Sequence, residues 1–476
     1  MVATNSRQLV LIGTLGQLPV QFSFDSTSFT FRDSSKTSPD VHVPLSHVLS
    51  VDVSGSVVDA HVLVRNRGHL DVVNISGNFQ EDDSEASSAA KDWVQGVMTA
   101  AYSGVKECRR LLVVVNPHGG RGKAISIFNH EVEPILKAAR CRYKAVYTEY
   151  GGHAEEIASQ ISLDDYDAVV TVSGDGTVHE LINGFAQHRE PMKAFRMPIA
   201  PIPAGSGNAA SLNLLGVEDG ANVTAATLNA IKGRPMAVDV LSILQSGKRS
   251  FSFLSQCVGL MADIDLGTEH LRWMGSSRFT YGFLRGVLTR KAYQFSISVK
   301  TVMSEKEKMA EALQEYNSSA PHYDVPPVEE GDATALPPLQ YVDKQDGWTT
   351  FEGPILHMYA GKGPFVSSDL MQFPVAMPND GVVDIVIQGM ISRVDMLKSY
   401  DGAETGALYW QDKAQYFKAS AYRLRPLQED GNLSIDGERL PFKEYYAEVH
   451  RGLATMLSMS GRYPVDFTLE RPPGSA

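Results

Sequence analysis

The feature that most constrains this chain is the stretch Val-Val-Thr-Val-Ser-Gly-Asp-Gly-Thr-Val-His-Glu, from Val169 to Glu180. A run of β-branched apolar residues ends there in a Gly-Asp-Gly turn, and the residues up to Phe185 have the pattern of a helix. The stretch predicts a strand, a sharp loop and a helix. In open α/β sheets, ligands bind at the carboxyl ends of the strands, where this loop lies. The glycines beside Asp175 allow backbone amides to approach a phosphate, whereas the alternative is an ordinary strand-to-helix turn.

Three further apolar runs are each followed by a polar loop and a helical pattern. The runs are Leu111–Val115, Tyr143–Tyr147 and Ile199–Ile202, and the loops are 116–123, 148–152 and 203–208. Four strand-loop-helix units in succession predict a parallel sheet with right-handed crossovers, which places all four loops at one edge. The first loop is not a Walker motif, because Pro117 and Ala124 occupy positions that the motif reserves for other residues. Convergence of the loops nevertheless predicts a nucleoside triphosphate site.

Composition narrows the class of protein. The net charge of −12 argues against a general nucleic-acid binder. Three scattered cysteines without metal spacing argue against a disulfide framework and favour a reducing compartment. The N-terminal apolar run lacks the features of a signal peptide, and no run reaches the ~18 apolar residues of a spanning helix. We therefore expect a cytoplasmic protein that contacts an intracellular or plasma membrane only peripherally.

The chain divides into several predicted units. Residues 1–105 contain short strand candidates closed by a helix with Trp93, which resembles a pleckstrin-homology-like domain; without a dense basic cluster, we expect it to serve packing or partner binding. Strands and helices alternate over 106–235, and strands dominate 236–302 and 350–465. The charged, Pro-rich segment 303–349 is expected to be a largely disordered insertion after a short helix, and 466–476 a C-terminal tail.

The loops at 116–123, 173–180 and 203–208 resemble those of the diacylglycerol-kinase catalytic superfamily. Within it, the chain is similar to the sphingosine (sphingoid long-chain base) kinases, from about Arg110 to Met459 without the insertion. The resemblance implies a phosphofructokinase-like α/β nucleotide domain followed by a mostly antiparallel β-sandwich lipid domain. It also implies transfer of the γ-phosphate of ATP to a lipid hydroxyl with Mg²⁺. His118 replaces an expected arginine, and the 150–152 segment replaces more polar residues.

The closer resemblance depends on the segments 262–272, Arg278-Phe279 and 436–438. It implies that Asp265 holds the lipid head group and that Arg272 and Arg278 reach the nucleotide phosphates. The turn at 436–438 is implied to return to the adenine nucleotide and metal side. The direct metal ligands stay unassigned.

The predicted contacts form two sets. Those to ATP are Asn116, Pro117, His118, Gly120, Gly122, Lys123, Thr148, Glu149, Tyr150, Gly151, Gly152, Glu180, Gly205, Ser206, Gly207, Arg272, Arg278, Asp436, Gly437 and Glu438. Those to the lipid are Ser173, Gly174, Asp175, Gly176, Ser255 and Asp265.

The chemistry expected of Asp175 is that of a general base. A carboxylate can accept the proton of an attacking hydroxyl as the P–O bond forms, a role worth roughly 10²–10⁴-fold in rate. Binding of Mg²⁺ or capping of the turn is the alternative. Two alternatives also remain for Glu180, which could contact the nucleotide or cap a helix. Lys123 could neutralise phosphate charge or lie exposed to solvent at the start of a helix. The two arginines could otherwise form surface salt bridges.

The substrate hypothesis depends on Asp265. A sphingoid base carries an ammonium group beside its reactive hydroxyl, so a buried carboxylate is a natural counter-ion, and leaving that acid unpaired would be costly. Asp263 could share this role or cap the turn. Apolar residues alternate with basic ones from Arg278 to Lys291, which predicts either a gate over the lipid tail or plain domain core.

The sequence therefore predicts an ATP- and Mg²⁺-dependent kinase of the primary hydroxyl of a sphingoid base (sphingosine, dihydrosphingosine or phytosphingosine). The alternatives are a ceramide or diacylglycerol kinase on the same scaffold, an NAD kinase, and a catalytically silent lipid-binding scaffold protein. The β-rich second half argues against the NAD kinase, and the intact glycines around Asp175 argue against the silent protein.

Overall fold

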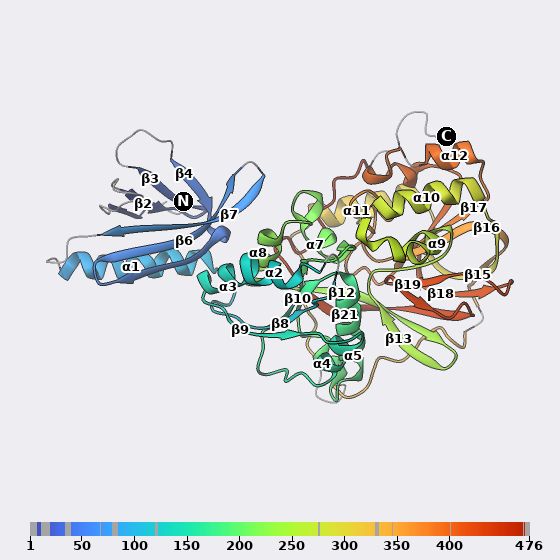
Figure 1. Cartoon of the computed structure of the whole chain (residues 1–476), viewed down its shortest axis with the longest axis horizontal. Coiled ribbons are helices and arrows are strands. Elements are labelled where there is room, and N and C mark those ends of the chain that lie inside the picture. Colours follow the sequence, from blue (N-terminus) through green and yellow to red (C-terminus); the bar gives the residue numbers. More distant parts are fainter. Residues whose placement is uncertain are drawn as a thin grey trace.

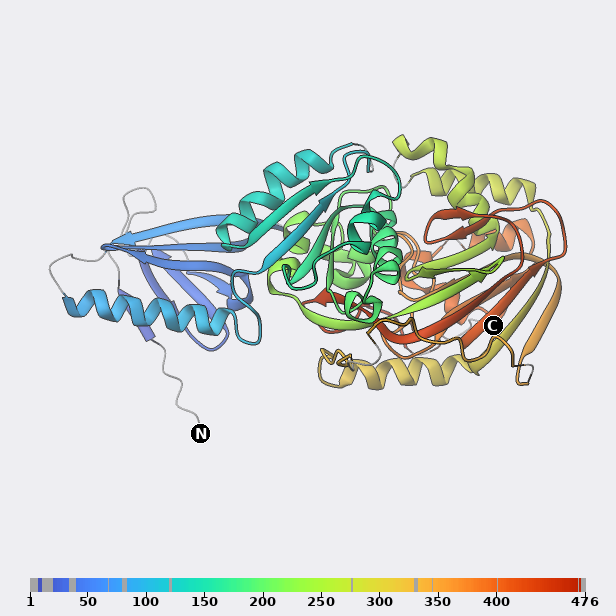
Figure 2. The same ribbon diagram turned by 90° about the horizontal axis from the view of Figure 1, so that it is seen from below.

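The computed structural model describes residues 7–10, 20–33, 40–66, 68–78, 84–119, 122–274, 277–328, 333–344, 346–399, 401–469 and 471. The N-terminal strands and helix α1 lie at one end of the molecule, and the rest of the chain forms a larger body beside them (Figure 1). Figure 2 shows α1 running along one side of these strands.

The N-terminal unit has two antiparallel sheets. One contains β1 (Arg7–Val10), β2 (Val20–Phe24), β3 (Ser28–Asp33) and β4 (Val41–Pro44), and the other contains β5 (Val48–Ser54), β6 (Val57–Asn66) and β7 (His69–Asn78). Trp93 on α1 (Ser84–Ala101) packs against Phe22 and Phe29, which explains its burial. A single 3-10 turn (Leu45–His47) follows Pro44 and separates β4 from β5.

The first half of the larger body, from β8 to α8, contains the predicted parallel strands. They are β8 (Arg110–Val115), β9 (Arg142–Tyr147), β10 (Ala168–Ser173) and β11 (Ile199–Pro203), in the order β9-β8-β10-β11. The intervening helices are α2 (Ala124–Ile127), a π-helical turn (Phe128–Val132), α3 (Glu133–Ala138), α4 (His153–Ser159), α5 (Asp175–Gln187), α6 (Pro191–Ala194), α7 (Ala209–Asp219) and α8 (Val223–Lys232). Since β10 and β11 are buried throughout, their continuous apolar sequence is that of strands covered on both faces.

The second half is mostly antiparallel. Its strands are β12 (Arg234–Gln245), β13 (Lys248–Ser252), β14 (Ser255–Gly259), β15 (Tyr293–Met303), β16 (Thr349–Gly361), β17 (Val383–Gly389), β18 (Ala414–Pro426), β19 (Leu433–Ile435), β20 (Glu438–Leu440) and β21 (Tyr445–Ser458). Strand β21 pairs antiparallel with β12 and β18 and also parallel with β11. The two halves therefore share one mixed sheet of 14 strands.

The described residues of the segment 303–349 are ordered, so the prediction of a largely disordered insertion is wrong. Helix α11 (Lys306–Ser318) buries Met309, Ala310 and Leu313 beneath its charged surface. The Pro-rich arm that follows is held by hydrogen bonds to its backbone: the N–H of Gln340 donates to Glu448 on β21 at 2.7 Å. The segment is ordered although it contains few apolar residues, because strands distant in the sequence supply its hydrogen-bond partners. The possible short helix is confirmed.

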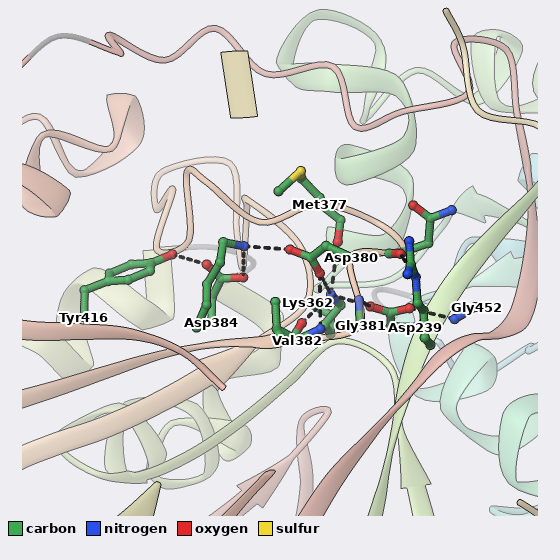
Figure 3. Close-up of polar contacts among 12 residues, drawn as sticks. Asp239, Lys362, Met377, Asp380, Gly381, Val382, Asp384, Tyr416 and Gly452 are labelled. Atoms are coloured by element: carbon green, nitrogen blue, oxygen red, sulfur yellow. Dashed lines mark hydrogen bonds and ion pairs between the residues drawn. The ribbon is translucent and has the colours of Figure 1, made fainter. Parts of the chain in front are cut away.

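A buried network of charges joins the strands of the second half (Figure 3). Lys362 donates to Asp239 and Asp380 at 2.8 Å, and Lys418 contacts Asp380 and Asp384 at 2.8 and 3.1 Å. Asp239 lies on β12 and also accepts the backbone N–H of Gly452 on β21 at 2.7 Å. The network thus fixes β17 and β18 against β12 and β21, the strands that connect the sheet to the parallel strands of the first half.

Candidate active site

The loops after β10 and β11 touch backbone to backbone. The N–H of Asp175 donates to the carbonyl of Gly207 at 3.2 Å. A Cβ on Gly205 would lie 2.3 Å from the Cα of Gly174, and a Cβ on Gly174 would lie 2.7 Å from the oxygen of Gly207. Both glycines are therefore required by close approach.

We expect Gly205→Ala to lower kcat/KM at least about tenfold and to destabilise the fold by about 1–3 kcal/mol, the usual cost of overpacking. The added methyl must push apart the two loops that position Asp175. Steady-state kinetics and urea unfolding measure both effects. Gly389→Ala is the matched control, since no atom lies within 4 Å of its Cβ; equal behaviour of the two variants would contradict the prediction.

Asp175 begins helix α5 and lies against the start of α7. Its two carboxylate oxygens accept the N–H groups of Ala209 and Ala210 at 2.8 and 2.9 Å, so it does cap a helix. Burial raises the pKa of Asp175 to about 6 against these two hydrogen bonds, and the charges of Asp436 and Asp265 act in the same direction as burial. A carboxylate with this pKa can accept a proton near neutral pH.

Asp436 holds three segments together. It has a positive φ of 52° and accepts hydrogen bonds from His179 Nδ1 (2.8 Å) and Ser252 Oγ (2.6 Å). The N–H groups of residues 253–255 also donate to it, at 2.9–3.0 Å. Burial opposes protonation of His179, but the hydrogen bond to Asp436 and the charges of Asp436, Glu438 and Glu155 together outweigh burial and raise the pKa of His179. The side chain of Asp436 therefore accepts hydrogen bonds from five protein donors, and residues 436–438 all line the cavity between the two halves of the molecule.

Glu180 caps the neighbouring helix. Its oxygens accept the N–H groups of Gly152 and Ala154, both at 3.0 Å, at the start of α4. Capping is one of the two roles that the sequence left open for Glu180, which also lines the cavity. The contact also fixes the loop after β9 relative to α5.

The first two loops contribute only part of their predicted residues to the cavity. Asn116 and Gly151 line it. Gly119 also lines it, although only the adjoining Gly120 was predicted to contact ATP. The other predicted residues of these loops that the structure describes are not among the residues that line the cavity: Pro117, His118, Gly122, Lys123, Thr148, Glu149, Tyr150 and Gly152. Tyr150 is 55% exposed and stacks on His153. Gly120 lies outside the described residues.

A cavity of about 520 Å³ connects the two halves of the molecule. Its polar end is formed by the loops at 173–177 and 205–207, with Ser255, Asp265 and the turn at 436–438. Its other end is lined mainly by apolar residues of α9 (Leu260–Gly267), α10 (Ser277–Thr289), β16 and β17. Other lining residues lie between 366 and 372 and between 399 and 411, where no sequence motif marked them.

Asp265 and Arg278 are neighbours at the polar end. Asp265 accepts a hydrogen bond from Ser434 at 2.6 Å, and a guanidinium nitrogen of Arg278 lies 3.7 Å from its carboxylate. The acid is therefore already close to a cation, whereas the sequence argument treated it as unpaired. The side chain of Arg272 lies outside the described part of the chain. Asp263 hydrogen-bonds Tyr293 and Asn432, which makes it structural.

The donors present suit a metal bound mainly through phosphates. The described residues contain no group of three or more His, Cys, Asp or Glu side chains that could hold a metal ion. Mg²⁺ commonly binds through one or two carboxylates plus substrate phosphates, so it needs no such group. Within the described ranges, none of the helices is long and apolar enough to cross a membrane.

Comparison with known proteins first gives the class. Residues 110–243 match the diacylglycerol kinase catalytic domain. A solved structure titled as a putative diacylglycerol kinase from Bacillus anthracis aligns with a TM-score of 0.50 at 20% identity, covering 74% of this chain and 98% of that one. This likeness agrees with the fold described above.

Full-length relatives then give the family. Sphingoid long chain base kinase 4 of Schizosaccharomyces pombe is 31% identical, over 88% of each chain. Human sphingosine kinase 1 is 30% identical, over 73% of this chain and 91% of its own. Sphingosine kinase 1 of Arabidopsis thaliana is 28% identical, over 86% and 88%. The chain belongs to the sphingoid long chain base (sphingosine) kinase family.

Proposed function

We propose that this protein transfers the γ-phosphate of ATP to the primary hydroxyl of a sphingoid base, forming its 1-phosphate. The observation that carries the proposal is one continuous cavity: Asp175 and Asp265 line its polar end beside glycine-rich loops, and its other end is mainly apolar. A molecule with a polar, cationic head and an alkyl tail matches both ends. The names of the relatives agree with this substrate class.

The nucleotide fits the loops at the carboxyl edge of the parallel strands. The loops after β10 and β11 pack backbone to backbone at Gly174 and Gly205, where no side chain lies between them. The absence of side chains there favours approach of phosphates to backbone N–H groups. Asn116, Gly151, Gly205, Ser206 and Gly207 are the lining residues that would hold ATP. Bound with Mg²⁺, ATP supplies the electrophilic phosphorus. The protein's task is then positioning and neutralisation of charge.

Asp175 would accept the proton of the attacking hydroxyl. Each of its oxygens accepts one backbone N–H, and each retains lone-pair capacity for a second donor. Its two hydrogen bonds to α7 fix its orientation, so the acid need not reorganise during the reaction. Capping and catalysis are therefore compatible roles.

Asp265 would hold the ammonium group of the base. With Arg278 3.7 Å away, binding of a second cation requires the carboxylate to be shared, or Arg278 to turn toward the nucleotide phosphates. Either arrangement favours a cationic head group, because the carboxylate and the guanidinium would each then have a partner of opposite charge.

We also propose the finer features of the architecture. Residues 1–105 would form a pleckstrin-homology-like domain, 106–235 the nucleotide domain, and the strands of 236–302 and 350–465 a lipid-binding sandwich. Helix α10 would contact a membrane peripherally from the cytoplasm, since Tyr281, Leu284 and Leu288 are 50%, 50% and 74% exposed while Phe279 and Phe283 line the cavity.

The test is phosphorylation of sphingosine, ceramide and diacylglycerol by the wild-type protein and by Asp265→Asn. We expect the wild type to phosphorylate sphingosine preferentially and the variant to lose at least about 30-fold in kcat/KM for it, because the amide cannot neutralise an ammonium group that the bound lipid would bury beside residue 265. Asp263→Asn, which alters an acid of the same helix that does not line the cavity, should keep the preference. Preferential labelling of ceramide or diacylglycerol, unaffected by Asp265→Asn, would contradict the proposal.

A further inference from the structure

A histidine lies on the cavity face of strand β16. His357 pairs across the sheet with Gly259 of β14 and with Gln388 of β17. Both His357 and Gln388 line the cavity, as do Tyr359, Val386 and Tyr416 on the same face of the sheet. The adjoining walls are apolar, with Leu260, Ile264, Leu356 and Met396 packed together. A polar pair thus interrupts an otherwise mainly apolar part of the cavity.

The imidazole of His357 has no protein partner among the residues that the structure describes. Its Nδ1 is buried without a hydrogen bond. Burial lowers the pKa of His357 to about 4, so the ring is neutral at physiological pH and offers one donor and one acceptor. Nδ1 is too enclosed for a ligand to reach, so the ring nitrogen available to a ligand in the cavity is Nε2. Leaving that nitrogen unpaired when a lipid excludes water from the cavity would cost free energy, so a ligand group that hydrogen-bonds it is favoured.

The side-chain amide of the neighbouring Gln388 uses only its donor group in hydrogen bonds to the protein. Its amide nitrogen donates to the carbonyl oxygens of Gly389 and Lys413 at 3.1 and 2.9 Å, which leaves its side-chain oxygen as an acceptor. A hydroxyl group can donate to one neighbour and accept from another. It therefore matches this pair in either tautomer of the histidine.

The position of His357 fits a group close to the head of the lipid. Helix α9 begins at Leu260, directly after Gly259, the residue that pairs with His357 across the sheet. Asp265 is the sixth residue of this helix, so about 9 Å of helix separates it from Gly259. The imidazole can therefore meet the alkyl chain within a few carbon atoms of an amine held at Asp265.

We infer that His357 and Gln388 form a polar subsite that binds a hydroxyl group on the lipid chain, a few carbons beyond the amine, and that the preferred substrates are sphingoid bases carrying this hydroxyl. The inference rests on the proposed function and names the class of base. His357 determines specificity and takes no part in the chemistry. Bases that are reduced and unhydroxylated at this position leave the imidazole unpaired in the complex.

The experiment compares phytosphingosine with sphinganine of equal length, which differ only in the 4-hydroxyl group. We expect wild-type kcat/KM to be about tenfold higher for phytosphingosine, the effect of one satisfied hydrogen bond in a buried site. His357→Leu should abolish most of this ratio by slowing phytosphingosine alone. His357→Gln, which retains donor and acceptor, should restore at least part of it. It also provides the test if the leucine variant fails to fold.

Ile391→Val is the matched control, because it changes the volume of the same cavity without changing its polarity; it should shift both bases equally. A wild-type ratio near one, or a ratio that is the same in His357→Leu and His357→Gln, would overturn the inference while leaving the proposed function intact. Phosphorylation of neither base by the wild type, with ceramide or diacylglycerol phosphorylated, would overturn both.

Discussion

Asp175→Asn is expected to lower kcat by about 10²–10⁴-fold, the contribution usual for a general base. The amide keeps the size of the side chain but cannot take the proton of the attacking hydroxyl. The decisive readout is single-turnover phosphorylation of sphinganine at saturating ATP, with the KM for ATP measured alongside. A pure helix cap would instead predict a loss of stability with kcat nearly unchanged.

The fold should tolerate this substitution. The asparagine side chain would keep one acceptor for the N–H groups of Ala209 and Ala210, and loss of the other costs about 1 kcal/mol. Because burial raises the pKa of Asp175 to about 6, its contribution to stability is fully present only below its unfolded pKa and is lost as the pH rises through about 6. The neutral amide removes the cost of that buried charge at neutral pH, so the two effects largely cancel.

The same pKa gives the catalytic step a pH dependence. Below about pH 6 Asp175 is protonated and cannot accept a proton, so kcat/KM should fall about tenfold per pH unit there. The acid limb should be absent from the residual activity of Asp175→Asn. A wild-type profile that stays flat down to pH 5 would contradict the assignment.

Lys362→Met is expected to destabilise the protein by about 3–5 kcal/mol, the cost of removing one partner from a buried ionic network. Lys362 is 1% exposed and contacts two carboxylates. Burial opposes its charge, yet Asp239, Asp380 and Asp384 outweigh burial and raise its pKa, so the lysine is charged. Its loss leaves buried carboxylates without compensation. Urea unfolding followed by tryptophan fluorescence measures the change.

Lys413→Met is the control for this prediction. Lys413 also forms an ion pair, with Asp395 at 2.9 Å, but its side chain is 57% exposed. Exposed pairs contribute about 0–1 kcal/mol, so this variant should unfold nearly as the wild type does. A change of less than about 1 kcal/mol in Lys362→Met would show that the network is dispensable.

The four parallel strands could be predicted from the sequence because the pattern that marks each of them is local. Each parallel strand carries its own loop at its carboxyl end, so the order of strand, loop and helix suffices to bring Asp175 and Gly205 to one edge. The glycines are predictable for the same reason: they mark backbone that must come close to something. In the structure these two glycines approach each other: a Cβ added to Gly205 would lie 2.3 Å from the Cα of Gly174.

The rest depends on contacts between distant segments. Asp436 looks like a site residue in sequence, yet its donors lie more than 180 residues away, in β13, β14 and α5. Segment 303–349 looks disordered because its composition is polar, and only its packing on β21 and the rest of the second half orders it. His357 follows the alternation of a strand, and its orphan ring becomes visible only once the register of β14, β16 and β17 is known.

The most direct test of the account is transfer of ³²P from the γ-position of ATP to lipid by the purified full-length chain, with sphinganine, ceramide and diacylglycerol offered together. The account predicts one dominant labelled product, the 1-phosphate of the sphingoid base. A dominant ceramide or diacylglycerol phosphate, or no labelled lipid from a folded protein that binds ATP, would contradict it.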